Sequence, residues 1–531
     1  MQETFTKQQQ YLFFGFILLL LVPALLINLG LIPFIDDEAM RALIALEMDL
    51  SGNYITPTIN GEYYYNKPPF YNWFLLLWFK AFGSYEEFVS RLATVFCLLA
   101  YAATIFYFSK KHYSTKFAFL NALFLITCGR ILIYDSMLGL IDIAFSWVTF
   151  TAFMIVYHQY EKRNFYALFG FTYLLTAIGF LMKGLPSLVF QGATLLAFFL
   201  YKKDFKKLFS LAHITGGMLF LLIIGAYYFT YNQYNSLETV FNTLIFESSR
   251  RTASTHGIGS TILHLFSFPF EVIYHFLPWT VLVVLFFQKS IRKILVADSF
   301  IVFCLLIFFA NILVYWMSVQ VYPRYLFMHL PLLFTSILYL YFQKNRQPLH
   351  KNIIDVVLGF LCFGLLLGIF APLFLERESE ISFLFLKIAI LSLLMGSLCW
   401  LFIKKKQERL LITIAVLLVA RIALNWFVLP ERYVIDWGTP VKESSIKVGK
   451  EFKGKPLFIF SKTLMQPTNG FYITREREDI FRYKETVDSP AELFIVDPFH
   501  VKRNFEYNIK GELKVRYKEL TFDVADNVRK K

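Results

Sequence analysis

Thirteen long apolar runs constrain this chain more than any other feature of its sequence. An α-helix needs about 20 mostly apolar residues to cross a bilayer, and each run approaches that length. The runs cover residues 11–33, 88–108, 117–134, 137–157, 165–182, 184–201, 209–230, 272–287, 299–316, 325–342, 353–374, 381–403 and 409–429. With 57% hydrophobic residues and a mean hydropathy of +0.53, the chain is too apolar for a soluble domain. We therefore predict a polytopic α-helical membrane protein with about 13 transmembrane helices.

The loops between these runs alternate in charge. One set is basic throughout and reads SKKHYSTK, HQYEKRN, YKKDFKK, QKSIRK, QKNRQPLHK and KKKQER. Because basic loops face the cytoplasm in membrane proteins, we predict an inner-membrane protein with a cytoplasmic N-terminus and an extracytoplasmic, periplasmic C-terminus. The same loops account for the net charge of +14, so we expect the lipid bilayer, and no nucleic acid, as a partner.

The composition changes near residue 430, which divides the chain into a transmembrane domain (1–430) and a C-terminal domain (431–531). In the second part, short apolar or alternating runs between turn residues predict strands, and they read GKPLFIFSK, GFYITRE, AELFIVD and LKVRYKELTF. We expect a small extracytoplasmic α/β domain that acts as a lid or docks the acceptor. All five cysteines lie within apolar runs, which favours buried thiols over disulfides or a zinc site.

The first predicted extracytoplasmic loop, residues 34–87, is dense in titratable and aromatic side chains. It opens on three adjacent acids, Asp36, Asp37 and Glu38. An amphipathic segment follows, with Leu43, Leu46 and Leu50 on one face, and we expect this face to hold the acids against the membrane surface. A carboxylate held there can act as a general base. The alternative is a solvated acidic loop without a catalytic role.

Isolated charges near the apolar runs need a partner or a function, because a charge at membrane depth costs about 2.5–3.5 kcal/mol. Lys67 lies in the rigid sequence NKPPFYNW, and Lys183 interrupts IGFLMKGLPSLV with no acid within ten residues. Either lysine suits a lipid phosphate, although each can instead extend to the headgroup region. Asp135 and Asp142 lie seven residues apart, which is two turns of a helix, so the pair favours a site. The alternative is structural pairing with Arg130 or with another helix.

A second group of charges lies in a later outer loop and at the start of a further run. Arg250 and Arg251 suit bidentate binding of a phosphate. His256 and His264 follow in the same loop, but their spacing matches no standard pair of zinc ligands. Arg324, in VQVYPRY, begins a run at the outer face.

Several segments resemble a known family. In the first loop they read DDEAMRALIALEM, SGNYITPTINGEYYYNKPPFYNW, FKAFG and SRL, and later they read GRILIYDSML, GFLMKGLPSLV, PW and PRYLF. Together they resemble the ArnT-like branch of the protein O-mannosyltransferase superfamily. This resemblance implies a C-type glycosyltransferase (GT-C) fold with thirteen spans, juxtamembrane helices on the outer face and an extracytoplasmic C-terminal domain.

The resemblance also implies roles for individual residues. Asp37 takes the position of the catalytic carboxylate, Asp135 takes that of a second acid, and Glu38, next to Asp37, is a third catalytic candidate. The positions of the cations that bind the donor phosphate are taken by Lys67, Lys183 and Arg250 or Arg251. Further candidates are Asp36, Arg41, Asp142, Tyr65, His256 and Arg324. The family places an arginine three residues after the catalytic aspartate, but here that position is Met40, and Arg41 is turned by about 100° on a helix.

By this resemblance we expect a glycosyltransferase that takes a sugar from an undecaprenyl- or dolichyl-type phosphate carrier and inverts the anomeric carbon. The expected acceptor is lipid A or another cell-surface glycan or lipid, and the alternative is a protein acceptor. A lipid or oligosaccharide transporter is the non-enzyme alternative, although the chain lacks the internal repeats typical of transporters. No metal or other cofactor is needed if lysine and arginine neutralise the phosphate, and a role for a divalent metal stays open.

Overall fold

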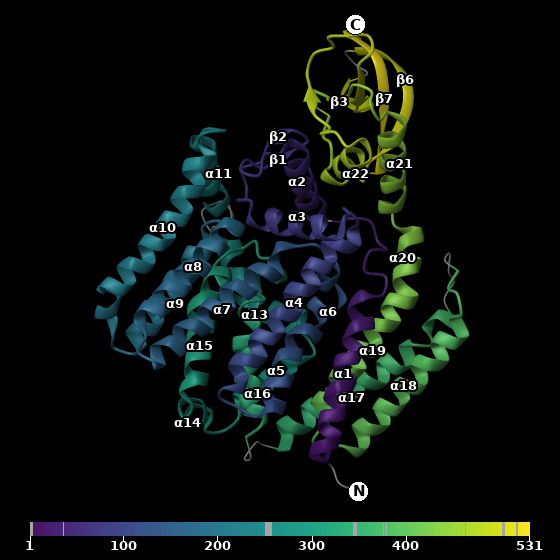
Figure 1. Ribbon diagram of the computed structural model, residues 1–531. Coiled ribbons are helices and arrows are strands. Elements are labelled where there is room, and N and C mark those ends of the chain that lie inside the picture. The colour runs from purple at the N-terminus through teal and green to yellow at the C-terminus, as the bar shows by residue number, and fades with distance from the viewer. Residues whose placement is uncertain are drawn as a thin grey trace.

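The computed structural model describes residues 4–35, 37–249, 258–343, 348–374, 376, 380–461, 463–501, 505–516 and 519–530. Figure 1 shows a bundle of long helices with a small domain of strands and helices at one end. The N-terminal residues lie at the opposite end of the bundle. We call the end beneath the small domain the domain end. The two ends fit the predicted topology, and the side of the membrane that each faces stays a prediction.

Nine helical segments of the described chain are long and apolar enough to cross a membrane. Seven of them are the single helices α1 (Lys7–Leu26), α4 (Glu87–Lys110), α7 (Ile141–Glu161), α8 (Phe165–Lys183), α10 (Leu211–Tyr231), α15 (Ser299–Trp316) and α18 (Leu384–Lys404). The other two combine α17 (Pro348–Gly368) with η5 (Ala371–Leu373), and α19 (Arg409–Ala423) with the π-helical η6 (Leu424–Val428) and α20 (Leu429–Ile435). The polytopic helical fold is thereby confirmed.

The remaining predicted spans also fall on helices, but these helices are short or broken. A tenth span forms if α5 (Thr115–Thr127) and the segment of α6 (Gly129–Ile133) and η1 (Asp135–Met137) count as one, with a bend of 53° between them. The helices α9 (Pro186–Tyr201) and α16 (Leu330–Tyr341) are apolar but shorter than 18 residues. The predicted span 272–287 is divided between α13 (Ile258–His275) and η3 (Trp279–Phe287). The count of thirteen is therefore not confirmed.

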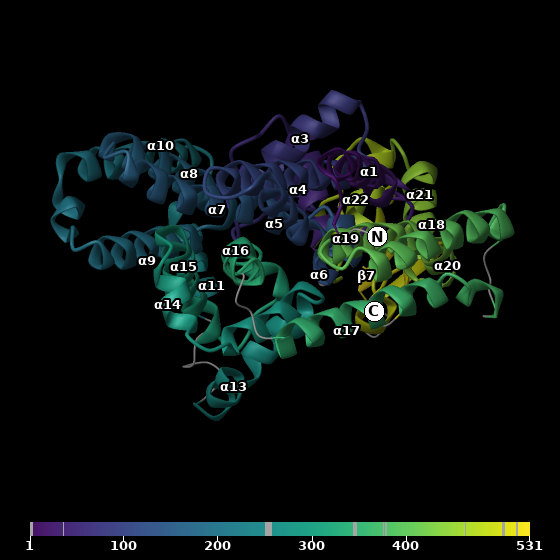
Figure 2. The same ribbon diagram turned by 90° about the horizontal axis from the view of Figure 1, so that it is seen from below.

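Shorter elements connect the long helices. They are η2 (Phe205–Phe209), α11 (Leu237–Ser249), α14 (Ile291–Val296) and η4 (Pro323–Leu326). Seen from below, the helices form two groups, with α7–α10 on one side of the bundle and α17–α20 on the other (Figure 2). The helices α4, α5 and α16 lie between the two groups.

The first loop folds into two helices and a small hairpin at the domain end (Figure 1). These are α2 (Glu38–Ser51), the strands β1 (Thr58–Ile59) and β2 (Glu62–Tyr63), and α3 (Phe70–Phe82). The predicted amphipathic helix is confirmed as α2, with Leu43 and Leu46 buried and Leu50 exposed. The expectation that this face lies on the membrane surface is wrong. It packs instead against α3 and against α22 (Pro467–Arg477) of the C-terminal domain.

The C-terminal domain contains a five-stranded mixed sheet in the order β4-β3-β5-β7-β6. The strands are β3 (Leu457–Phe460), β4 (Tyr483–Lys484), β5 (Leu493–Val496), β6 (Phe505–Lys514) and β7 (Thr521–Lys530). β3 pairs in parallel with β4 and β5, whereas β7 pairs antiparallel with β5 and β6. The helices α21 (Gly438–Glu451) and α22 cover one face, and the short α23 (Pro498–Val501) adds to the core on the other face.

The predicted strand at GFYITRE is wrong, because these residues lie in α22. The alternation of apolar and polar residues here reflects a helix that is buried on two sides. Phe471 and Tyr472 join the core of the helix bundle, whereas Ile473 joins the core of the C-terminal domain. The strands predicted at GKPLFIFSK and AELFIVD are confirmed as β3 and β5, and LKVRYKELTF covers the turn between β6 and β7.

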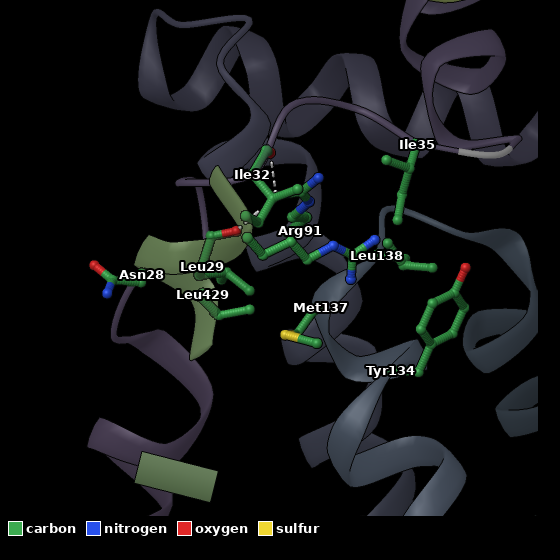
Figure 3. Close-up of a pocket in the computed structure, with 10 residues that line it drawn as sticks. Asn28, Leu29, Ile32, Ile35, Arg91, Tyr134, Met137, Leu138 and Leu429 are labelled. Atoms are coloured by element: carbon green, nitrogen blue, oxygen red, sulfur yellow. Dashed lines mark hydrogen bonds between the residues drawn. The ribbon is translucent and has the colours of Figure 1, made fainter. Parts of the chain in front are cut away.

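A buried ion pair holds the chain between α1 and α2. Arg91 of α4 donates to both oxygens of Glu38, at 2.7 Å and 3.1 Å, and the two side chains are 2% and 0% exposed. Arg91 also donates to the carbonyls of Leu29, Ile32 and Pro33 at 2.8–3.2 Å. Figure 3 shows Arg91 crossing between this segment and Leu138, beside a cavity of about 20 Å³. The pair therefore fixes the residues that precede α2.

We predict that replacing Arg91 by methionine destabilises the protein by about 3–5 kcal/mol, because Glu38 is left buried without its counter-charge. Thermal unfolding in detergent measures the loss. The matched control is Lys202→Met, which removes an ion pair with Glu161 that is largely open to solvent. It should cost at most about 1 kcal/mol. Equal unfolding temperatures for the two variants would contradict the structural role of the buried pair.

Candidate active site

Charged side chains from four elements meet at the domain end of the bundle. Asp142, in the first turn of α7, forms an ion pair with Lys183, the last residue of α8. Arg324 of η4 lies between two carboxylates, with its Nε 3.6 Å from Asp142 Oδ2 and its Nη2 2.9 Å from Asp37 Oδ2. Asp142 and Arg324 are buried and the side chain of Lys183 is 9% exposed, whereas that of Asp37 is 39% exposed. A carboxylate that is accessible to a substrate therefore lies beside a buried group of charges.

Lys67 adds a cation that has no ion-pair or hydrogen-bond partner among the described residues. Burial, together with the nearby charges of Arg41 and Lys183, lowers the pKa of Lys67 to about 7, although Asp142 and Asp37 act in the opposite direction. Two prolines follow Lys67 directly and fix the backbone that leads into α3. Lys67 therefore lies near Asp37 and Asp142, and its ammonium group can still donate hydrogen bonds to a ligand.

Arg41 lies on the inward side of α2, with its side chain 1% exposed. Its Nη2 donates to the Tyr64 hydroxyl at 2.6 Å, and the guanidinium lies 5.2 Å from the centre of the Tyr64 ring. Its Nε and Nη1 have no partner among the described residues. We refer to six residues together as the charge cluster, namely Asp37, Arg41, Lys67, Asp142, Lys183 and Arg324.

Asp135 lies in η1 and is 2% exposed. Arg130 donates to its Oδ2 at 2.6 Å, which is the structural pairing left open by the sequence. Its Oδ1 has no partner among the described residues, and the carboxylate lies within electrostatic range of Asp142 and Arg324. Asp135 therefore lies near the charge cluster, but its carboxylate already forms an ion pair with Arg130.

Tyr65 lies on the α10 side of Lys67. Its hydroxyl accepts from Asn235 Nδ2 at 3.1 Å. Tyr65 and Lys67 both border a narrow cavity of about 10 Å³, and the other residues of its wall are Pro57, Tyr64, Pro68, Tyr227, Tyr228, Tyr231, Val240 and Leu244. The hydroxyl of Tyr228 is buried there without a partner among the described residues.

Glu38 does not point into the charge cluster. Besides Arg91, its two oxygens accept from the backbone N–H groups of Ile35 and Gly139, each at 2.8 Å. With every oxygen occupied and the side chain fully buried, Glu38 has a structural role and no free oxygen for catalysis. This corrects the prediction that Glu38 belongs to the catalytic set.

Four predicted site residues lie outside the described residues: Asp36, Arg250, Arg251 and His256. His264 is described and lies on α13, where its Nε2 is 3.4 Å from the Tyr315 carbonyl. Within the described ranges, no group of three or more histidine, cysteine or acidic side chains is arranged to hold a metal ion.

Two functional features escaped the sequence interpretation. Arg324 joins Asp37 to Asp142, whereas the sequence named Arg324 as a candidate site residue without its two partners. Glu47 of α2 holds the β1–β2 hairpin by accepting from Thr58 Oγ1 and from the Asn60 N–H, at 2.5 Å and 2.6 Å. Burial raises the pKa of this carboxyl despite these hydrogen bonds. A charged residue among the apolar residues of a helix is the signal that could have identified Glu47.

Comparison with known proteins supports the resemblance. Residues 66–229 match the dolichyl-phosphate-mannose-protein mannosyltransferase family, and this segment contains Lys67, Asp135, Asp142 and Lys183. The undecaprenyl phosphate-alpha-4-amino-4-deoxy-L-arabinose arabinosyl transferase of Shewanella sediminis (strain HAW-EB3) is 29% identical over 204 residues, which are 35% of this chain and 36% of that protein. An uncharacterized protein of Aquifex aeolicus (strain VF5) is 25% identical over 241 residues, 44% of this chain and 47% of that protein. The chain thus spans half or less of the length of these curated relatives.

Solved structures match over nearly the whole chain. The crystal structure of ArnT from Cupriavidus metallidurans bound to undecaprenyl phosphate superposes with a TM-score of 0.72 at 16% identity and covers 98% of both chains. The apo structure of the same protein gives a TM-score of 0.71 with the same coverage. The molecule is therefore a multi-pass membrane protein with a GT-C glycosyltransferase fold. Within that class its fold is ArnT-like, and the resemblance predicted from the sequence is confirmed.

Proposed function

We propose that this protein is an inner-membrane glycosyltransferase that transfers a sugar from a polyprenyl phosphate to an acceptor outside the cytoplasm. The ArnT structure from Cupriavidus metallidurans with bound undecaprenyl phosphate supports a carrier of this type. The name of the Shewanella sediminis relative supports the same donor class. No metal or other cofactor enters the proposal.

The charge cluster is the observation that carries this proposal. It holds four cations, Arg41, Lys67, Lys183 and Arg324, against the two carboxylates of Asp37 and Asp142. The excess of positive charge lies where two membrane-spanning helices, α7 and α8, meet the first loop. An anionic headgroup whose tail stays in the bilayer fits such a site, because fixed cations in a water-poor pocket stabilise phosphate strongly.

The reaction follows from this distribution of charge. The acceptor oxygen attacks the anomeric carbon of the sugar, and the bond between that carbon and the phosphate oxygen breaks, with inversion at the carbon. The leaving polyprenyl phosphate gains one negative charge in this step. Lys67 and Lys183 stabilise that charge, and Arg250 or Arg251 adds to them by the family resemblance. Arg41 is a further cation beside Lys67.

Asp37 is the residue that we propose to act on the acceptor. Its carboxylate is held by Arg324 through Oδ2 and stays partly exposed. If the acceptor is a hydroxyl, Asp37 takes its proton as the new bond forms. If the acceptor is itself a phosphate, Asp37 aligns the anomeric centre. Asp135 is the second acid and lies within electrostatic range of Asp142 and Arg324.

For the acceptor we propose lipid A or another glycan or lipid of the cell surface, with a protein as the alternative. The experiment that tests the function combines the purified protein with labelled polyprenyl-phosphate sugars and a panel of these acceptors. Transfer to any of them supports the proposal. No transfer from any polyprenyl-phosphate sugar, with a correctly folded protein, would refute it.

We predict that Asp37→Asn lowers the rate of transfer by about 100-fold or more, because the amide neither takes a proton from a hydroxyl acceptor nor keeps the charge that pairs with Arg324. Donor binding should change little, since the cations around the phosphate remain. The rate is measured with labelled donor, and binding is measured separately with polyprenyl phosphate. Glu62→Gln is the matched control, because Glu62 is an exposed carboxylate in the same loop. Full activity of Asp37→Asn would exclude the assigned role.

We predict that binding of polyprenyl phosphate weakens as the pH rises through about 7, where Lys67 loses its proton in the free protein. Below this pKa the lysine is charged and attracts phosphate, whereas above it the neutral amine does not. The affinity should therefore fall by about tenfold per pH unit at most. Equilibrium binding at pH 6 and pH 8.5 measures the change.

Lys67→Arg is the control for this titration, because arginine keeps its charge over the whole range. The phosphate itself also titrates, with a second pKa near 6, and this contribution is common to both proteins. The variant should therefore lose the weakening that belongs to Lys67. An identical pH dependence in both proteins would contradict the role of Lys67.

A further inference from the structure

The segment that leads into Asp37 has its backbone groups bound by buried side chains. Arg91 donates to the carbonyls of Leu29, Ile32 and Pro33. The N–H group of Ile35 donates to Glu38. These partners all belong to the transmembrane domain, but no residue of that domain among those described accepts from the N–H group of Phe34.

The partner of Phe34 comes from the C-terminal domain. The Phe34 N–H donates to the hydroxyl of Tyr472 in α22 at 3.1 Å. The ring of Phe34 is fully buried and lies 5.0 Å from the centre of the Phe471 ring and 6.2 Å from that of Tyr472. The C-terminal domain therefore contacts the backbone three residues before Asp37.

The Tyr472 hydroxyl is itself fixed from the transmembrane side. It donates to Glu87 Oε1 at 2.5 Å, at the start of α4. Lys442 of α21 donates to the same oxygen at 2.7 Å. Next to them, Arg475 of α22 forms an ion pair with Glu86 at 3.3 Å. Tyr472 is thus oriented so that its oxygen accepts from Phe34, and it cannot turn away without breaking the hydrogen bond to a buried carboxylate.

The backbone of α22 also lies very close to the first loop. A Cβ atom at Gly470 would be 2.2 Å from Asn60 Oδ1 and 3.2 Å from Leu43 Cδ2. Such close approach leaves no room for the domain to sit nearer, and an added Cβ atom requires either α22 or the Asn60 side chain to shift.

We propose that Tyr472 is a positioning residue, through which the C-terminal domain sets the place of the Asp37 carboxylate. This inference rests on the proposed function, in which Asp37 acts on the acceptor. Arg324, in the helix bundle, forms an ion pair with the Asp37 carboxylate. Tyr472, in the C-terminal domain, accepts a hydrogen bond from the backbone of Phe34, which precedes Asp37. Without the Tyr472 hydroxyl, the segment keeps its Arg91 contacts but loses the hydrogen bond at Phe34, so Asp37 is no longer fixed from both sides.

The test is Tyr472→Phe in the full-length protein, which removes only the hydroxyl oxygen. We expect kcat to fall by about tenfold, because small displacements of a reacting group are costly, while the KM for donor and acceptor stays unchanged. Hydrogen exchange at the Phe34 amide should be faster by about tenfold or more. Tyr483→Phe is the matched control, because the hydrogen bond that its hydroxyl accepts among the described residues comes from the Met465 N–H within the C-terminal domain, at 3.4 Å. It should leave both readouts unchanged.

Gly470→Ala is a second variant that leaves all hydrogen-bonding groups in place. It should also lower kcat and raise exchange at Phe34, because it moves α22 away from the loop. If Tyr472→Phe leaves exchange at Phe34 as in the wild type, or raises exchange without lowering kcat, the inference is wrong. A rise in the acceptor KM with unchanged kcat would also overturn it and would make the domain an acceptor-binding element. If the wild type transfers no sugar at all, the proposed function fails, and the exchange measurement alone decides whether Tyr472 holds the loop.

Discussion

Pairing of the buried charges at the domain end is the constraint on which the site depends. Asp142 lies at the start of an apolar helix, and its carboxylate is tolerated there because Lys183 and Arg324 approach it from two other elements. Arg324 then extends to Asp37, so the same cation joins a buried carboxylate to an exposed one. The positions of α7, α8, η4 and α2 relative to one another are therefore linked through a single chain of ion pairs.

A second set of buried contacts gives Asp37 and Glu38, which are neighbours in the sequence, different roles. Glu38 turns inward to Arg91 and the backbone, while Asp37 stays at the surface of the charge cluster. Adjacent carboxylates thus have opposite environments, one fully occupied by donors and the other open to a substrate. This difference explains why only one of them is suited to a reaction that needs a free oxygen.

The sequence predicted the fold class and most of the residues that meet in the charge cluster. Alternating apolar runs and basic loops indicated the helical membrane domain, and the motifs around Lys67, Asp135 and Lys183 indicated the site. It did not predict that Arg324 bridges two aspartates, nor that α22 packs on α2, because both depend on contacts between residues far apart in the sequence, the least distant being Asp142 and Arg324. The helical period of α22 was hidden because Phe471, Tyr472 and Ile473 are buried against two different cores.

Arg41 illustrates how a departure from the family pattern can keep the charge of a site. The shift from position 40 to 41 turns the side chain on the helix, yet its guanidinium still lies inside the protein, between Tyr64 and the surroundings of Lys67. The nearby charge of Arg41 helps to lower the pKa of Lys67 to about 7. Without a ligand, Lys67 can therefore lose its proton, which reduces the repulsion among the cations of the charge cluster. In the proposed reaction the departing phosphate gains charge and favours the protonated lysine, so the cluster is most positive when the leaving group is most negative. A cation three residues after Asp37 would lie on another side of α2. From that side it would not be placed, as Arg41 is, to lower the pKa of Lys67.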